Sequence, residues 1–226
     1  YPLFKTACVY IYSLLFASIL TFINLKKIKS KELAVSNAII NLITILAFLT
    51  QGLYVLSELR EAYILQSDQY FVSTSMNIGI RYISLAFFAL LITSCYLLSK
   101  SEMFKVKFKT AFDYLLYIAI LWVLSSELLH ILELSGLQTG YKLGLSILWG
   151  GYALFLIGMG LWKNRKYLRI GAIALFAITL IKLFFYDISS LDTISKTIVF
   201  VSLGVLLLII SFLYNKYKHL IIDDVK

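Results

Sequence analysis

Charged residues and proline are both scarce in this sequence. Only 15% of the 226 residues are charged and 61% are hydrophobic, with a mean hydropathy of +0.88. Soluble domains have about a quarter of their residues charged. The single proline, Pro2, precedes every long apolar run, so none of these runs contains the strongest helix breaker. The composition excludes a water-soluble fold and favours long membrane helices.

The apolar runs match the length of a helix that crosses a bilayer, which takes about 20 residues at about 1.5 Å each. Strands of a membrane barrel would be about 10 residues long and would alternate apolar and polar positions, and these runs do not alternate. The sequence therefore predicts an all-α polytopic transmembrane bundle in one domain, residues 1–226. Because the sequence begins at Tyr1, we expect it to be the C-terminal part of a larger protein. About seven spans are predicted, at 4–25, 33–58, 80–99, 110–133, 142–162, 170–187 and 196–215.

Basic residues are concentrated in alternate connections. Most of the 21 lie at Lys26, Lys27, Lys29 and Lys31, at Lys100, Lys105, Lys107 and Lys109, at Lys163, Arg165, Lys166 and Arg169, and at Lys216, Lys218 and Lys226. The positive-inside rule assigns these connections to the cytoplasm. We therefore expect the N-terminus outside and the C-terminus inside a bacterial inner membrane. This clustering makes membrane lipid the expected partner of the net charge of +9, and nucleic acid is not expected.

Cysteine and histidine occur twice each. Cys8 and Cys95 are predicted near opposite membrane faces, so we expect no disulfide, which requires Cα atoms within about 7 Å. His130 and His219 are also predicted on opposite sides. Neither residue type has metal-ligand spacing, and no nucleotide-binding or nucleophile motif occurs. The sequence predicts neither a metal site nor a cofactor.

Small residues recur on one face of the fifth predicted span, and polar residues recur on one face of the second. Gly144, Gly151 and Gly158 repeat every seven residues, which predicts a close helix–helix contact that Gly151→Leu would disrupt. The polar stripe in the second span predicts either hydrogen bonds between helices or a wet solute pathway. Its members are Asn37, Asn41, Thr44, Gln51 and Glu58.

Ionisable residues gather near the predicted outer ends of three spans. Such residues inside a membrane are the first candidates for a functional site. Three interpretations remain open: structural ion pairs of Lys182 with Glu127 or Glu58, a site for an ion, a proton or a polar headgroup, and a catalytic site. In the catalytic interpretation His130 or Glu127 is the base and Lys182 stabilises charge. The candidate binding residues are Glu58, Glu127, His130, Lys182 and Asp187.

The last third of the sequence contains a recognisable motif. It combines Lys-x-Phe-x-x-Asp-x-x-x-Leu, from Lys182 to Leu191, with Phe-x-x-Leu-Gly, from Phe200 to Gly204. This stretch resembles the C-terminal part of the bacterial membrane proteins catalogued as domain of unknown function 2339. The resemblance implies a longer parent protein with many spans and marks Lys182 and Asp187 as motif residues, but it implies no activity.

The function favoured by these patterns is a non-enzymatic membrane module in transport or envelope scaffolding. Two alternatives stay open. One is a membrane enzyme that acts on a lipid-linked glycan or phospholipid at the outer leaflet, and the other is a seven-helix sensor. Besides lipid, the expected partners are other helices of a longer parent chain or a second copy of this chain.

Overall fold

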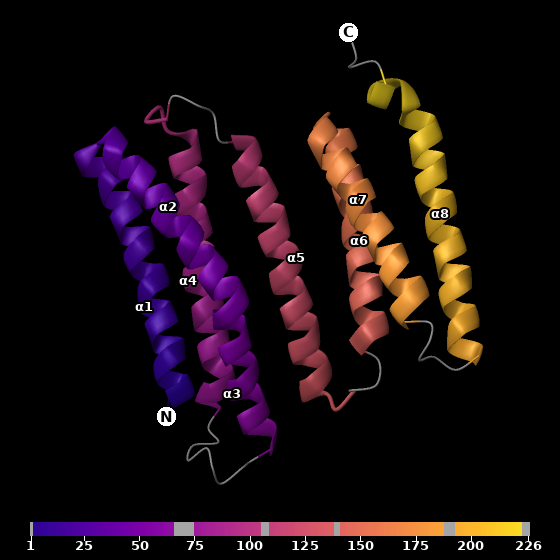
Figure 1. Cartoon of the computed structure of the whole chain (residues 1–226), viewed down its shortest axis with the longest axis horizontal. Coiled ribbons are helices and arrows are strands. Elements are labelled where there is room, and N and C mark those ends of the chain that lie inside the picture. The colour runs from indigo at the N-terminus through magenta and orange to yellow at the C-terminus, as the bar shows by residue number, and fades with distance from the viewer. Residues whose placement is uncertain (1, 66–74, 105–108, 138–140, 188–192, 223–226) are drawn as a thin grey trace. The chain divides into compact units, whose positions relative to one another are not determined.

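The computed structural model describes residues 2–65, 75–104, 109–137, 141–187 and 193–222. These ranges are built of helices (Figure 1). The α-helices are α1 (Pro2–Ile23), α2 (Lys31–Ala47), α3 (Leu53–Leu65), α4 (Met76–Lys100), α5 (Lys109–Leu134), α6 (Tyr141–Trp162), α7 (Lys166–Lys182) and α8 (Thr193–Ile222). Three π-helical turns extend or join them: η1 (Asn24–Ile28), η2 (Phe48–Gly52) and η4 (Leu183–Asp187).

Six of the described helices are long and apolar enough to cross a membrane. They are Pro2–Ile28, Lys31–Leu65, Met76–Lys100, Thr110–Leu134, Tyr141–Trp162 and Lys166–Tyr186. They coincide with the first six predicted spans, which confirms an all-helical membrane fold with six candidate spans. The predicted seventh span lies within α8, whose apolar stretch Lys196–Ile209 is shorter than a full crossing.

The second span is longer than predicted. Residues 59–65, which follow the predicted end of the second span at 58, continue α3, and Ala62 is buried. Residues 66–74 lie outside the described residues. The chain divides into two compact units, unit 1 (Tyr1–Leu134) and unit 2 (Ser135–Lys226), and the assignment of residues 1–226 to one domain stays a prediction.

The α1–α2 hairpin of unit 1 is closed by the buried side chain of Asn24. Its Nδ2 donates to the Ser30 carbonyl oxygen at 3.1 Å, and its Oδ1 accepts from the Ser30 backbone N–H at 3.0 Å. Ser30 Oγ in turn accepts from the Leu33 N–H at 3.3 Å and caps α2. These bonds satisfy backbone groups that a tight turn between two membrane helices would otherwise leave exposed to lipid.

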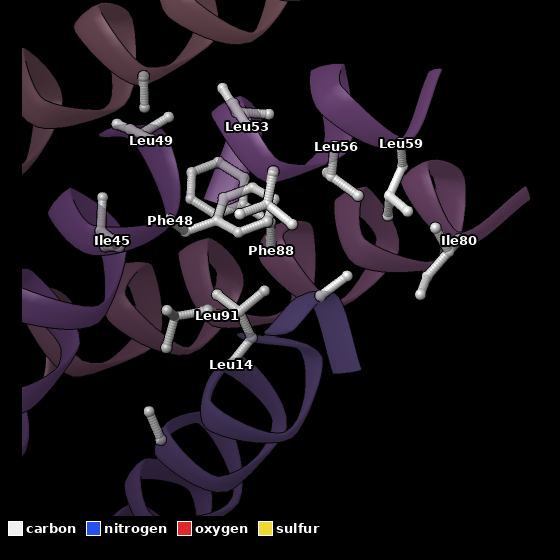
Figure 2. Close-up of a cluster of buried hydrophobic side chains, with 14 residues drawn as sticks. Leu14, Ile45, Phe48, Leu49, Leu53, Leu56, Leu59, Ile80, Phe88 and Leu91 are labelled. Carbon is white, nitrogen blue, oxygen red and sulfur yellow. The ribbon is translucent and has the colours of Figure 1, made fainter. Parts of the chain in front are cut away.

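The apolar core of unit 1 lies where α1, α2, α3 and α4 meet (Figure 2). The rings of Phe48 and Phe88 stack with centroids 4.9 Å apart. Leu14 from α1 and Leu91 from α4 are fully buried beside them. Hydrophobic burial against lipid gives little drive for association, so this interlocking of side chains supplies much of the contact energy.

In unit 2, α6 and α7 form a tight hairpin around Gly160. The hairpin begins with a Schellman-type helix end: Asn164 has a φ of 47°, and the Arg165 N–H donates to the Gly160 carbonyl at 2.8 Å. A Cβ at Gly160 would lie 2.8 Å from Cγ of Arg169. The glycine that allows α7 to pack closely against α6 is therefore Gly160, which is not part of the predicted seven-residue repeat.

The predicted glycine repeat occupies a different face of α6. Gly151 and Gly158 are exposed, and a Cβ at either would meet no atom within 4 Å among the described residues; Gly144 is half-buried. The repeat is thus not the contact with α7, and the predicted close helix–helix contact of these glycines stays a prediction.

Candidate functional site

The predicted polar stripe contributes hydrogen bonds between α1 and α2. Asn41 Nδ2 donates to Thr21 Oγ1 at 2.9 Å, and the Thr21 hydroxyl lies 3.3 Å from Asn41 Oδ1. Asn37 Nδ2 donates to the Leu20 carbonyl at 3.4 Å. Both asparagines are buried, so their polar atoms are used in joining two helices.

The stripe is not continuous, and the prediction of a single polar face is wrong at Gln51. Gln51 is exposed, whereas its neighbour Gly52 is buried. The cause is η2, because a π-helical turn holds one extra residue and rotates all later residues by about 100° relative to a plain α-helix. Thr44 bonds its own helix at the Ile40 carbonyl, at 2.8 Å, and Glu58 is half-buried.

The extra residue in η2 turns Arg60 onto the buried face, where it forms an ion pair. The Arg60 guanidinium contacts the Glu133 carboxylate and thereby joins α3 to α5. The Arg60 side chain is 5% exposed and that of Glu133 is 34% exposed. A cation predicted to lie in an outer connection is therefore inside unit 1.

A second ion pair joins α4 to α5. Arg81 Nε lies 2.6 Å from Glu127 Oε1, and Arg81 Nη2 donates to Ser126 Oγ at 2.7 Å. The Arg81 side chain is 0% exposed. Glu127, which the sequence singled out, is thus held by a residue that the sequence did not single out.

His130 lies on α5 between the two glutamates. It is 1% exposed, and its ring is nearly perpendicular to that of Tyr82, with centroids 6.2 Å apart. Neither ring nitrogen has a hydrogen-bond partner within the described ranges. We define the outer cluster, named for the side of the membrane on which the sequence predicts it, as Arg60, Arg81, Glu127, His130 and Glu133. Figure 1 shows α3 and α5 ending, and α4 beginning, at the same end of unit 1, which is where this cluster lies.

Lys182 and Asp187 belong to unit 2. Lys182 Nζ donates to Ser146 Oγ at 2.8 Å and to the Lys142 carbonyl at 3.2 Å, so it anchors the end of α7 on α6. Asp187 ends η4, and its side chain is outside what the structure describes. The predicted pairing of Lys182 with Glu127 or Glu58 would join the two units, and it stays a prediction.

The sequence as a whole matches one protein family. The family described as "Predicted membrane protein (DUF2339)" matches residues 3–217. The chain belongs to this family. The resemblance seen in the last third of the sequence is confirmed and extends through unit 1. No curated protein and no solved structure is similar to the chain.

This DUF2339 protein also has an apolar groove in unit 1, of about 370 Å³, between α2, α4 and α5. Its walls include Val35, Leu42, Cys95, Phe112 and Leu115. Phe112 and Leu115 lie near the beginning of α5, whereas the outer cluster lies near its end. In this DUF2339 protein the groove and the outer cluster are therefore separate features.

Proposed function

We propose that this DUF2339 protein is a non-enzymatic membrane module that scaffolds envelope components in a bacterial inner membrane. The observation that supports this role is the use of intramembrane polar groups as links between helices. Asn41 bonds Thr21 across α1 and α2, and two arginine–glutamate pairs hold α5 against α3 and α4. Such links favour a fixed bundle over a moving one.

The enzyme alternative is less well supported by the same contacts. A base that acts on a lipid-linked substrate must reach the proton that it removes. The carboxylate of Glu127 is engaged by Arg81, and Lys182 is bonded to Ser146 and to the Lys142 carbonyl. A transport pathway along the second span is also less well supported, because Asn37 and Asn41 bond to α1 and Gln51 faces outward.

We further propose seven spans, with α8 as the seventh, the N-terminus outside and the C-terminus in the cytoplasm. The support is the alternation of lysine-rich connections, two of which are the α1–α2 and α6–α7 hairpins. Membrane lipid is the partner proposed for the apolar surface. Further helices of a longer parent chain, or a second copy, are proposed for the open glycine face of α6.

Thiol labelling tests both proposals. In a protein with Cys8→Ser and Cys95→Ser, single changes Asn41→Cys, His130→Cys, Ser135→Cys and Lys163→Cys are exposed to a membrane-impermeant maleimide from outside. We expect labelling at 135 only, with 163 reacting after permeabilisation. Labelling at 41 and 130 in a folded protein would instead indicate a water-filled pathway and would contradict the scaffold. Labelling at 163 from outside would reverse the topology.

Complex size gives a positive test of scaffolding. Membranes cross-linked before solubilisation are expected to yield the chain in complexes larger than one copy on native gels. Gly151→Leu, on the open face of α6, is expected to reduce that size while Gly79→Leu, on α4, leaves it unchanged. A single-copy band for the cross-linked wild-type protein would contradict the scaffolding role.

A further inference from the structure

Several hydrogen-bond donors of the outer cluster are not paired with acceptors of the cluster. Arg81 Nη1, Arg60 Nε and Nη1, and both ring nitrogens of His130 lack partners among the described residues. Arg60 is 4% exposed, Arg81 0% and His130 1%. A buried donor without an acceptor is destabilising, and a charged one is more so. Several such donors in one place favour a ligand made of acceptors.

Two glutamates of α5 hold the arginine donors beside one stretch of this helix. Glu127 and Glu133 are six residues apart, which is about 9 Å along the helix axis, and His130 lies midway between them. Glu127 fixes the guanidinium of Arg81 from α4, and Glu133 fixes that of Arg60 from α3. His130 is therefore within one helical turn of each glutamate that positions a guanidinium group.

We propose that the outer cluster binds a phosphate-type oxyanion through Arg60, Arg81 and His130. Guanidinium groups present planar pairs of N–H donors that match the oxygens of such an anion. A metal cation would not fit, because both carboxylates are already engaged by arginines. The glutamates are positioning residues that aim the arginines, and the two ion pairs carry no net charge of their own.

The oxyanion has two chemically equivalent sources. The cluster lies at the end of unit 1 where three helices terminate, so the phosphate of a lipid headgroup would be at a matching depth (Figure 1). Free phosphate could reach the same end from water. This inference is independent of the scaffolding role, because neither source requires a partner protein.

The test uses the full chain purified in dodecyl maltoside, a detergent without phosphate. In one arm, thermal unfolding is followed as inorganic phosphate is added at constant ionic strength with chloride. In the other arm, phosphatidylglycerol is added to the micelles and compared with diacylglycerol. A ligand that binds only the folded state raises the unfolding temperature in a saturable way. Stabilisation in either arm supports the site and names the source, and stabilisation in neither arm overturns it.

Variants locate the binding. Arg60→Gln combined with Glu133→Gln removes one guanidinium and its partner carboxylate together, so no charge is left unpaired. We expect its apparent affinity for the stabilising ligand to fall at least tenfold. Arg165→Gln, in unit 2, is the matched control and is expected to bind as the wild type does. Should the double variant fail to fold, His130→Phe takes its place with the same expectation. Wild-type affinity in the folded variant used would overturn the site.

Discussion

The ring of Phe48 occupies the space that a side chain at Gly52 would need. A Cβ atom at position 52 would lie 2.6 Å from Phe48 Cδ2 and 3.2 Å from its Cγ. Phe48 is fully buried and stacked on Phe88, so its ring has no free space to move into. The π-helical turn η2 and the centre of the unit 1 core therefore depend on the same glycine.

Gly52→Ala is expected to destabilise the protein because it overpacks this core. Overpacking of a well-packed site costs about 1–3 kcal/mol. The control is Gly79→Ala on α4, where a Cβ meets no described atom within 4 Å. That change is expected to be neutral or to stabilise by about 0.4–1 kcal/mol. Unfolding in mixed micelles of increasing dodecyl sulfate content measures both. Equal stabilities of the two variants would show that Phe48 can move aside.

Arg81→Gln is expected to destabilise unit 1 more than the double change Arg81→Gln with Glu127→Gln. The single change leaves the Glu127 carboxylate without its cation, and breaking a buried pair in this way costs about 3–5 kcal/mol. Because Glu127 is 21% exposed, we expect the lower end of that range. The free energy of unfolding of the four proteins in the cycle gives the coupling. A double variant as unstable as the single one would contradict this account.

Asn41→Leu is expected to loosen the α1–α2 contact by about 1 kcal/mol, the scale of hydrogen bonds between membrane helices. Thr21→Val should cost less once Asn41 has been replaced, because the two side chains share one interaction. Thr44→Val is the control, since its hydroxyl bonds only its own helix at Ile40 in the contacts seen here. Additive effects at 21 and 41 would show that the bond contributes nothing.

Gly160→Ala is expected to separate α6 from α7. The added Cβ would lie 2.8 Å from Arg169 Cγ and 3.1 Å from the Arg169 backbone nitrogen, and backbone cannot swing away as a side chain can. Gly158→Ala, on the open face, is the matched control. A disulfide-trapping assay between α6 and α7, or the unfolding free energy, distinguishes the two. Indistinguishable variants would place the close contact elsewhere.

Much of the fold follows from the length of the apolar runs, whereas the orientation of Gln51 and Arg60 depends on the π-helical turn η2. A helix with a constant 3.6 residues per turn would have Gln51 on the same face as Asn41, which is what the spacing of the polar residues predicts. One extra residue in η2 reverses that assignment. A five-residue turn has no composition that distinguishes it from its α-helical neighbours, and only packing, here of Phe48 against Gly52, reveals it.

Two of the five residues of the outer cluster were among the candidate binding residues predicted from the sequence. Glu127 and His130 were singled out because ionisable groups are rare within spans. Arg60 and Arg81 were not among those candidates, because a basic residue near the end of a span usually reaches water, as the lysines of the hairpins do. The charges of these residues could have predicted the ion pairs. Each arginine is a cation at the same depth as a glutamate on α5, and oppositely charged groups at one depth tend to pair.

The extra residue in η2 also makes the chain tolerant of a change in length at that point. Removing the exposed Thr50 or Gln51 would return the turn to ordinary α-helical geometry and leave every later side chain facing as it does now. The same deletion four residues further on would swing Arg60 about 100° away from Glu133. A deletion within η2 is therefore expected to be tolerated, whereas a deletion one helical turn later is expected to break an ion pair.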